Sequence, residues 1–416
     1  MLSGMQDKEL YRQILNIRDP WKVAEVNLDR KQGAVEVEVE WDPCHPLSCP
    51  ECGVKGAQYD CRKRSWRHLD TCQYRTILTA KIPRIKCEEH GVRQVAVPWA
   101  EPRSRFTALF ESLIIDWLKE ASVSAVADQM RLSWDEVDGV MQRAVKRGLI
   151  RREQQDLKKI GIDDTSFQKR HEYVTVINDL ERGVVVDVLD DRKQETLEGW
   201  LESRGKGALE HVEVVAIDMW QAYIQAIRKV IPKAEKKIVF DKFHVAQHIG
   251  NAVNHVRRQE HLVFRANGES PLTRSKYLFL RGEEMLSSEQ AERLEHLCRC
   301  AHKTARAWSL KELARYLWDY NVRGWARRAW LKWCSKAMRS RLEPMKKVAR
   351  MIRKHLDGIV NAAVLGVTNS RSEAVNSRIQ WLKKMACGFR NRDRFRNAIL
   401  FHHAGLELYP MQENQA

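Results

Sequence analysis

The sequence predicts an α/β protein whose central domain is a mixed sheet covered by helices. Short, β-branched apolar runs bounded by turn residues lie between residues 158 and 241, and such runs are typical of buried strands. Three of them follow one another directly, and the last two alternate with helical stretches near 193–204 and 219–230. Strands joined first by hairpins and then by helices imply a sheet with antiparallel and parallel pairs.

Aspartates stand where the first, fourth and fifth of these strands are expected to end: Asp163, Asp218 and Asp241. Chemistry in open α/β sheets gathers at the carboxyl ends of the strands. With the first strand central and the fourth beside it, Asp163 and Asp218 face each other and offer the oxygen ligands that Mg²⁺ or Mn²⁺ prefers. A pair of such ions about 3.5–4 Å apart activates the attacking oxygen of a phosphodiester reaction and stabilises the leaving one. This chemistry generally needs a third carboxylate.

Positive charge is concentrated after the predicted sheet. The chain has a formal net charge of +17, yet residues 158–243 sum to −1, residues 244–370 to +13 and residues 371–400 to +6. A surplus this uneven indicates an anionic partner, and nucleic acid is the first candidate. The alternative is a well-solvated helical surface. No run reaches the ~18 apolar residues of a membrane span, and the first residues do not have the regions of a secretory signal, so we expect a cytoplasmic protein.

Two closely spaced ligand pairs near the amino terminus predict a zinc site. Each pair is separated by two residues and followed by glycine: Cys49 with Cys52, and Cys87 with His90. Four such ligands on two tight knuckles close a tetrahedral site, and closed sites are structural. The alternatives are free thiols without metal, or a ligand swap or a second site that uses side chains nearby, which are Cys44, His45, Cys61, His68 and Cys72. Residues 34–41 and 74–80 are the expected strands of this module.

Residues 103–150 carry apolar side chains at the three- and four-residue spacing of helices. A short helix over 124–130 is followed by a turn and by a second helix, which begins at Ser133 with a capping box to Glu136 and ends at Gly148. This arrangement matches a helix-turn-helix, and the alternative is a plain three-helix packing unit. The basic residues that support DNA binding here are Lys146, Arg147, Arg151 and Arg152.

A long helical stretch separates the fifth strand from the next motif. Five tryptophans alternate there with arginine and lysine: Trp308, Trp318, Trp325, Trp330 and Trp333. At helical spacing most of these rings are expected in the core, and one or two remain to stack on unpaired bases. The basic faces of the same helices are suited to phosphates.

Glu373 is the best candidate for the third carboxylate. It opens a predicted helix and shares a face with Asn376, Ser377, Gln380 and Lys384. Ser370 and Glu373 also have the spacing of a capping box, in which Glu373 would only accept a backbone N–H. Spacing alone does not decide between these two roles.

Several motifs, taken together, resemble the transposases of the ISL-three (ISL3) insertion-sequence family. They occur in the family's order along nearly the whole chain: GIDDTSF at 161–167, AIDMW at 216–220, FDKFHV at 240–245, NSRSEAVNS at 369–377 and GFRNRDRF at 388–395. The resemblance implies a ribonuclease-H-like core with a DDE triad that falls on Asp163, Asp218 and Glu373. Asp164 stands where glutamate is commoner, and strand alternation puts Asp163 and Asp164 on opposite faces without saying which faces the site.

The resemblance also implies cofactors and contacts. The triad would bind two Mg²⁺ or Mn²⁺ ions, and the zinc would be structural. Asp164, Asp241 and His244 are candidates to orient the ligands, although Asp241 is equally placed to cap a helix. The residues expected to position DNA follow the predicted Glu373 helix or lie on it: Arg371, Arg378, Lys383, Lys384, Arg390 and Arg392.

We therefore expect five parts: a zinc module (1–100), a helix-turn-helix domain (101–155), the ribonuclease-H-like core (156–245 and 366–400), a basic helical insertion (246–365) and a carboxyl-terminal tail (401–416). The expected function is a transposase that binds terminal inverted repeats as at least a dimer, in the prokaryotic nucleoid, and performs Mg²⁺-dependent DNA cleavage and strand transfer. The alternatives are a catalytically inactive DNA-binding protein descended from a transposase, and a metal-dependent DNA nuclease.

Overall fold

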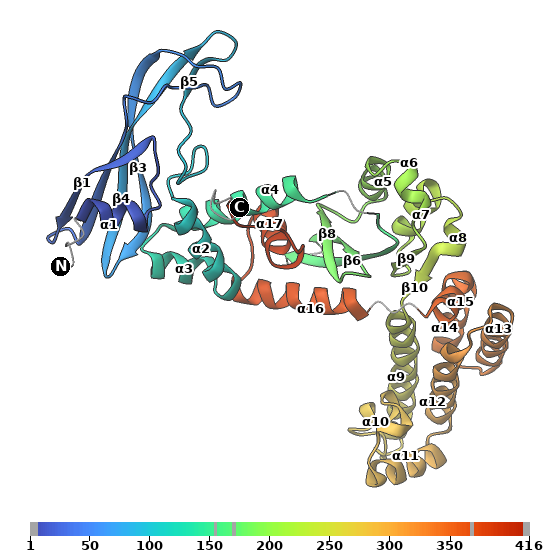
Figure 1. Ribbon diagram of the computed structural model, residues 1–416. Coiled ribbons are helices and arrows are strands. Elements are labelled where there is room, and N and C mark those ends of the chain that lie inside the picture. Colours follow the sequence, from blue (N-terminus) through green and yellow to red (C-terminus); the bar gives the residue numbers. More distant parts are fainter. Residues whose placement is uncertain (1–6, 154–155, 169–171, 367–369, 411–416) are drawn as a thin grey trace, which may run out of the picture. The chain divides into compact units, whose positions relative to one another are not determined.

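The chain forms two compact units in the computed structural model (Figure 1), which describes residues 7–153, 156–168, 172–366 and 370–410. One unit consists of residues 1–152 with 406–416, and the other of residues 153–405. Within the described ranges, no helix combines the length and apolar character that crossing a membrane requires. Part of the expected Glu373 motif, residues 368 and 369 together with the side chain of Ser370, lies outside this description.

The first unit begins with a helix and a five-stranded sheet. The elements are α1 (Asp7–Ile14), β1 (Trp21–Asp29), β2 (Ala34–Trp41), β3 (Gln58–Thr71), β4 (Tyr74–Cys87) and β5 (Gly91–Gln94). The first four strands pair in the order β1-β2-β4-β3, and β5 pairs with the last residues of β4. The strand expected over 34–41 is present, whereas β4 runs beyond residue 80. Its later residues Ile82 and Ile85 are fully buried against the rest of the sheet core, so the antiparallel pairing with β3 continues.

Three helices follow the sheet: α2 (Ala108–Glu120), α3 (Val123–Met130) and α4 (Trp134–Arg151). Arg131 adopts a left-handed conformation that ends α3, and Ser133 caps α4 through the expected capping box with Glu136. The expected end of α4 at Gly148 is wrong, because the helix continues to Arg151. Gly148 is buried where an added Cβ would lie 2.6 Å from the Cβ of Leu406, so this glycine permits close packing inside the helix.

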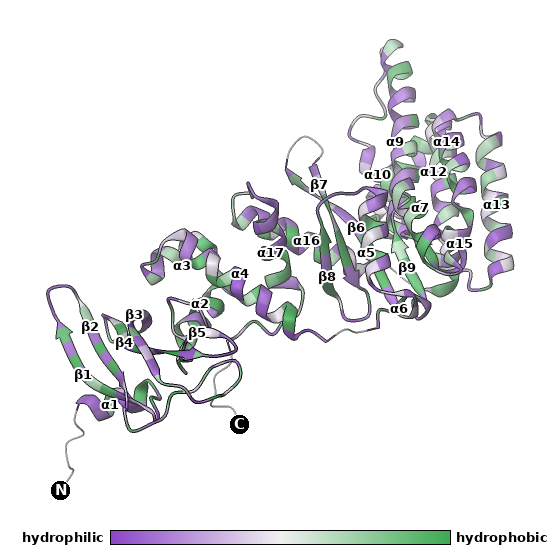
Figure 2. Cartoon of the chain, turned by 90° about the horizontal axis from the view of Figure 1, so that it is seen from above, coloured by the Kyte–Doolittle hydropathy of each residue, from purple (hydrophilic) through white to green (hydrophobic). Residues whose placement is uncertain are grey.

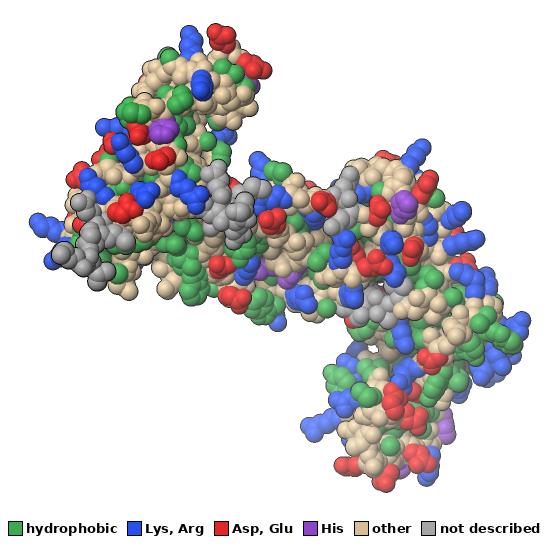
Figure 3. Space-filling view, viewed as in Figure 1, with side chains coloured by type: hydrophobic (Ala, Val, Ile, Leu, Met, Phe, Trp, Pro, Cys, Tyr) green, Lys and Arg blue, Asp and Glu red, His purple; other side chains and the backbone are tan. Residues whose placement is uncertain are grey.

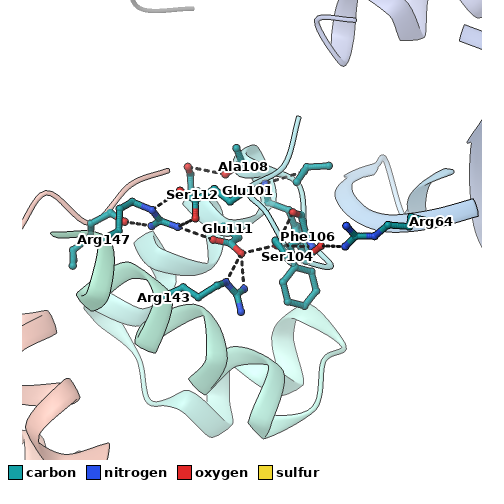
Figure 4. A network of polar contacts seen from close by, with 12 residues as sticks. Arg64, Glu101, Ser104, Phe106, Ala108, Glu111, Ser112, Arg143 and Arg147 are labelled. Atoms are coloured by element: carbon teal, nitrogen blue, oxygen red, sulfur yellow. Dashed lines mark hydrogen bonds and ion pairs between the residues drawn. The ribbon is translucent and has the colours of Figure 1, made fainter. Parts of the chain in front are cut away.

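A buried polar network joins these helices to the segment before them (Figure 4). Glu111 on α2 accepts from Arg143 and Arg147 on α4 and from Ser104, whose carbonyl accepts from Arg64 on β3. Arg147, expected among the DNA-facing residues, is therefore engaged inside the protein. Buried charges persist only when they are paired, and here the guanidiniums of Arg143 and Arg147 both pair with carboxylates.

The second unit contains the predicted mixed sheet. Its strands are β6 (Lys159–Gln168), β7 (Glu172–Asp179), β8 (Val184–Leu189), β9 (Val214–Ile217) and β10 (Ile238–Phe240), and they pair in the order β10-β9-β6-β7-β8. The strand β7 is antiparallel to both of its neighbours, β6 and β8, whereas β6, β9 and β10 are parallel to one another. The strand β9 is buried along its whole length and carries hydrophobic colours in Figure 2. The first strand is thus central and the fourth lies beside it, as expected.

Helices surround this sheet and extend from it. Between the strands lie α5 (Gln194–Ser203), α6 (Lys206–Glu210), α7 (Gln221–Val230) and α8 (Ala234–Lys237); after β10 come α9 (Lys242–Ala266), α10 (Lys276–Leu280), α11 (Ser288–Cys300), α12 (His302–Arg315), α13 (Arg323–Arg339), α14 (Glu343–Lys354) and α15 (Leu356–Leu365), with short 3₁₀ turns at Glu283–Met285 and Tyr316–Asp319. One hydrophobic core runs from β6 and β9 through to α15. The basic helices therefore continue the core of the sheet.

Two contacts fasten α15 to the edge strand β10. Asn361 is fully buried, and its side-chain amide donates to the carbonyls of Ile238 and Glu235 at 2.7 and 2.9 Å. Gly358 lies directly against the ring of Phe240, where any larger side chain would collide with it. All three residues of this edge strand are buried.

The insertion tryptophans divide as expected between core and surface. Trp330 and Trp333 are buried and Trp308 and Trp318 are partly buried, whereas Trp325 is 58% exposed. The guanidinium of Arg328 lies 4.9 Å from the centre of the Trp325 ring. Figure 3 shows lysine and arginine side chains gathered over this part of α13, which exposes Arg323, Arg327, Arg328 and Lys332.

The last two helices, α16 (Ser370–Met385) and α17 (Arg392–His403), return to the sheet. On α16, Gln380 donates to the hydroxyl of Thr165 at 2.9 Å, and Ser372 packs against Gly161, so this helix lies along β6. On α17, Phe395 is buried against Phe167. The tail was expected over 401–416, but α17 continues to His403, and of the residues after it the described ones from Leu406 to Pro410 belong to the first unit.

Candidate active site

Asp163 lies on β6, and Asp218 directly follows β9, the parallel neighbour of β6 in the second unit. Ile162 is in register with Ile217, so each aspartate occupies the next position along its strand direction. The expectation that Asp163 ends its strand is wrong, because it is the fifth of ten residues in β6. The hairpin of β6 with β7 continues to Gln168, whereas β9 stops at Ile217. Asp163 therefore marks the end of the parallel part of the sheet.

Hydrogen bonds fix both carboxylates. Oδ2 of Asp163 accepts from the side-chain amide of Asn376 on α16 at 2.7 Å, and its Oδ1 accepts from the backbone N–H of Asp164 at 2.8 Å. Oδ1 of Asp218 accepts from the backbone N–H of Trp220 at 2.9 Å. The unbonded lone pairs remain available to a cation.

The carboxylates are crowded and partly buried. Burial is the main cause that raises the pKa of Asp163 to about 6, and the carboxylates of Asp164 and Asp218 act in the same direction. Burial also raises the pKa of Asp218, again with a contribution from Asp164. Like charges gathered in a partly desolvated place disfavour ionisation unless a cation balances them.

Glu373 lies in the first turn of α16, which places it near the same cluster. Burial raises its pKa, and the Asp241 carboxylate raises it further. His244 counteracts the shifts of Glu373, Asp163 and Asp218, so this ring lies within electrostatic reach of all three. The proposed cap on Glu373 involves the side chain of Ser370, which lies outside the described residues.

Asp241 begins helix α9. Its Oδ1 accepts from the backbone N–H of Phe243 at 3.1 Å, which is the helix-capping role considered from the sequence. Its Oδ2 is buried, has no hydrogen-bond partner among the described residues and lies 4.0 Å from Nε2 of His244. The Glu373 carboxyl lies within hydrogen-bonding reach of Asp241, and two carboxyl groups this close need a shared proton or a cation between them.

Sequence reasoning missed two residues at this site, Arg192 and Trp220. Arg192 precedes α5 and pairs with Asp164, with its Nη1 3.3 Å from Oδ2 of that carboxylate. Its guanidinium lies over the ring of Trp220, whose backbone holds Asp218. An isolated arginine between a strand and a helix has no distinctive spacing, so only the fold reveals this neighbourhood.

The residues expected to position DNA fall into two groups. Arg371 donates to the carbonyls of Leu180 and Glu181, and Lys383 donates to the carbonyl of Ser166, so both have internal partners. Arg392 forms an exposed ion pair with Glu172 at 3.1 Å. Three others are exposed, and no side-chain partner is found for them within the described part of the chain: Arg378, Lys384 and Arg390.

The four predicted zinc ligands come together in the first unit. Their ligand atoms all lie within 4.8 Å of one another: Cys49, Cys52, Cys87 and His90. Sγ of Cys52 is 3.6 Å from Sγ of Cys87, and Nδ1 of His90 is 3.6 Å from Sγ of Cys87 and 3.9 Å from that of Cys49. Zn–S and Zn–N bonds of about 2.3 and 2.0 Å at tetrahedral angles give separations of about 3.5–3.8 Å. The donor set and its spacing therefore fit zinc.

The chain matches three family models. They are a transposase model of the ISL3 group at residues 160–399, the helix-turn-helix domain of transposase family ISL3 at residues 95–145, and the zinc-finger of transposases IS204/IS1001/IS1096/IS1165 at residues 45–90. The first of these spans more than half of the chain.

Individual proteins are similar over most of the length. The transposase for insertion sequence element IS1001 of Bordetella parapertussis is 28% identical over 394 residues, which cover 88% of this chain and 97% of that protein. The transposase for IS1557 of Mycobacterium tuberculosis is 27% identical and covers 82% of each chain. Among solved structures, the Drosophila P element transposase strand transfer complex aligns with 74% of this chain and 94% of its own, at 11% identity and a TM-score of 0.39.

Proposed function

The chain belongs to the ISL3 family of transposases, and we propose that it cuts and joins DNA at the ends of an insertion sequence through Asp163, Asp218 and Glu373. The observation that carries this proposal is the pair Asp163 and Asp218 at the end of the parallel strands, together with Glu373 in the first turn of the helix whose Asn376 bonds Asp163, with the pKa of each carboxyl raised by burial. The strand order β10-β9-β6-β7-β8, in which only β7 runs antiparallel to the other strands, supports assigning the sheet to the ribonuclease-H-like class.

The side chains fit a pair of Mg²⁺ or Mn²⁺ ions. Carboxylate oxygens are the ligands these hard cations prefer, and the crowding of negative groups and the closeness of the Glu373 and Asp241 carboxyls are features that a cation would relieve. When bound, such ions would activate the attacking oxygen and stabilise the leaving one. Asn376 holds Asp163, the Trp220 backbone holds Asp218, and Asp241 and His244 lie beside Glu373, so ligand orientation is set by the chain itself.

The chemistry would proceed in two displacements. In the first, a water oxygen forms a bond to phosphorus at the transposon end, and the bond to the 3′-oxygen breaks, which leaves a 3′-hydroxyl. In the second, this hydroxyl attacks a phosphodiester of target DNA, and a target 3′-hydroxyl leaves. The exposed Arg378, Lys384 and Arg390 are suited to hold the strand by its phosphates without reading its sequence.

The first unit would recognise the terminal inverted repeats, with α4 as the recognition helix and zinc holding the knuckles together. Residues 156–245 and 366–400 would form the catalytic core and residues 246–365 its basic insertion. Because strand transfer joins two ends, the active assembly would be at least a dimer on nucleoid DNA.

The test is a cleavage and strand-transfer assay in Mg²⁺ with the DNA ends of the element that encodes this chain. It compares wild type with Asp163→Ala, Asp218→Ala and Glu373→Ala, and measures end binding in parallel. We expect all three variants to bind ends normally and to be inactive. Activity of Glu373→Ala would make Glu373 a helix cap and move the third ligand to a neighbour. Wild type that binds without cutting would favour a DNA-binding protein, and cutting without joining would favour a nuclease.

A further inference from the structure

The side chain of Arg192 is held by three different elements beside the catalytic carboxylates. Its guanidinium carbon lies 4.2 Å from the ring centre of Tyr173 on β7 and 4.6 Å from that of Trp220 before α7. Its Nη1 lies 3.3 Å from Oδ2 of Asp164 on β6. Stacking on aromatic rings and an ion pair together fix the plane of a guanidinium.

This arrangement leaves donors without partners. The contact with Asp164 uses Nη1 alone, and among the described residues no acceptor is found for Nε or Nη2 of Arg192. The side chain is 36% exposed. It lines a cavity of about 490 Å³ whose wall also includes Tyr173, Trp220, Lys193 and Arg392. The wall also carries Glu172, Asp191 and Glu195, and Glu172 and Asp191 pair with Arg392 and Lys193, so the free donors of Arg192 are what would suit a planar or tetrahedral oxyanion here.

The hollow adjoins the reaction site directly. Trp220 stacks with Arg192 while its own backbone N–H bonds Asp218. Asp164, which pairs with Arg192, is the residue after Asp163. The charge of Arg192 also acts on Asp218, where it opposes the rise in pKa that burial causes. A phosphate between Arg192 and the carboxylates would thus belong to the strand being cut.

A purely structural role explains these features less well. An ion pair at 3.3 Å between side chains that are 36% and 22% exposed is screened by water and contributes little stability. The two aromatic rings restrict the movement of the Arg192 side chain. A side chain held in this way loses less conformational entropy when it binds a ligand.

We propose that Arg192 binds a non-bridging oxygen of a phosphate within one nucleotide of the scissile bond, with Tyr173 and Trp220 holding its guanidinium in place. This assignment deepens the proposed function and rests on it. No bond is made or broken by Arg192, which donates hydrogen bonds and neutralises charge on the strand.

The test removes charge from the protein, at Arg192, and from the DNA, at single phosphates. Single methylphosphonates, which replace one charged oxygen with a methyl group, are placed at each phosphate from two nucleotides before to two after the scissile bond. Single-turnover cleavage by the full-length protein in Mg²⁺ is then measured for wild type, Arg192→Ala and Arg192→Lys. The matched control is Arg182→Ala, which removes an exposed arginine paired with Asp179 at the β7–β8 turn.

We expect Arg192→Ala to lower the rate on ordinary DNA by about 10- to 100-fold, the range of a hydrogen bond to a charged group. At one phosphate, the methylphosphonate should slow wild type and Arg182→Ala to a similar degree and should slow Arg192→Ala no further. Arg192→Lys should recover only part of the rate, because it keeps charge but loses the flat stacked geometry. Thermal melting identifies variants that fail to fold, and Arg192→Lys then provides the comparison.

Three results would overturn the assignment. Additive effects of Arg192→Ala and the methylphosphonate at every position would show that no phosphate near the cut is gripped. A wild-type cleavage rate in the double variant Asp164→Asn/Arg192→Ala would show that Arg192 only neutralises the charge of Asp164. These first two results require an active wild type, so they leave the transposase proposal intact. Failure of wild type to cleave unmodified ends would remove both proposals together.

Discussion

At the residue scale, Asp163 links the stability of the protein to its metal. Its pKa is about 6 in the folded protein and 3.8 in an ordinary setting, so between these values the folded state holds a proton that the unfolded chain has lost. Stability then falls as the pH rises through this window and stays lower above it. We expect the free energy of unfolding of wild type, compared with Asp163→Asn, to drop by roughly 1–3 kcal/mol from pH 4 to pH 7 in Mg²⁺-free buffer.

Urea denaturation at both pH values measures this difference, and subtraction of the Asp163→Asn values removes the contribution of other titrating groups. At pH 7, added Mg²⁺ should stabilise wild type and leave Asp163→Asn nearly unchanged. A difference between the two proteins that is the same at both pH values would contradict the raised pKa.

Asn376 is the second prediction at this scale. It donates to Oδ2 of Asp163 at 2.7 Å and so aims one ligand. Removing a partner that orients a metal ligand typically lowers metal affinity or activity by about 10- to 100-fold. Asn376→Ala should therefore slow single-turnover cleavage by about this factor while end binding persists. Raising Mg²⁺ should recover part of the loss. Asn254→Ala, which removes an amide bonded to Arg257 on α9, is the control; equal rates for the two variants would exclude an orienting role for Asn376.

Individual residues also show where sequence reasoning reaches its limit. The positions of Asp163, Asp218 and Glu373 were available from motifs, although Asp163 lies in the middle of β6 and not at its end. The pairing of Asp163 with Asn376 and of Asp164 with Arg192 could not be predicted from the sequence. Strand alternation puts the two aspartates on opposite faces of the sheet but does not say which face each one occupies. Arg371 and Lys383 have the same residue types as surface phosphate ligands, and only their backbone partners reveal an internal role.

At the scale of elements, the glycines of α4 give a matched pair. Ala is preferred over Gly in a helix by about 1 kcal/mol, yet a Cβ at Gly148 would lie 2.6 Å from the Cβ of Leu406. Gly148→Ala should therefore destabilise the first unit by about 1–3 kcal/mol, as overpacking does. At Gly139, the Cβ would meet only Nη1 of Arg143 at 3.5 Å, so Gly139→Ala should stabilise. Chemical denaturation tests both, and equal signs would mean that helix propensity alone decides.

Elements with strong local patterns were predicted, and those that depend on partners were not. The strands β6 to β10 and the capping box at Ser133 follow from alternation, turn residues and side-chain hydrogen bonds. The length of β4 and the continuation of α4 past Gly148 depend on β3 and Leu406, which are distant in sequence. The helical insertion was predicted, but its shared core with β9 and β10 required Asn361 and Gly358 to be placed.

At the scale of the whole molecule, the zinc ligands and the candidate catalytic carboxylates belong to separately packed units. The zinc ligands and α2 to α4 lie in the first unit, whereas all the candidate catalytic carboxylates lie in the second. Within the first unit, His68 on β3 bonds the side chain of Thr107, which caps α2, at 2.9 Å. The sheet that carries the zinc knuckles therefore supports the start of the helical region.

Loss of zinc should consequently remove end binding without disturbing the catalytic sheet. Cys52→Ser should abolish the single zinc per chain measured by elemental analysis, and hydrogen exchange should accelerate in β3, β4 and β5 while β6 and β9 stay protected, because only the first unit loses the cross-link. Cys44→Ser, at an exposed thiol outside the four-ligand cluster, should keep zinc, binding and exchange unchanged. Asp163→Asn should show the opposite pattern, with ends bound and none cut. Zinc loss in Cys44→Ser would reassign the ligand set, and faster exchange of β6 in Cys52→Ser would mean that the two units do not unfold independently.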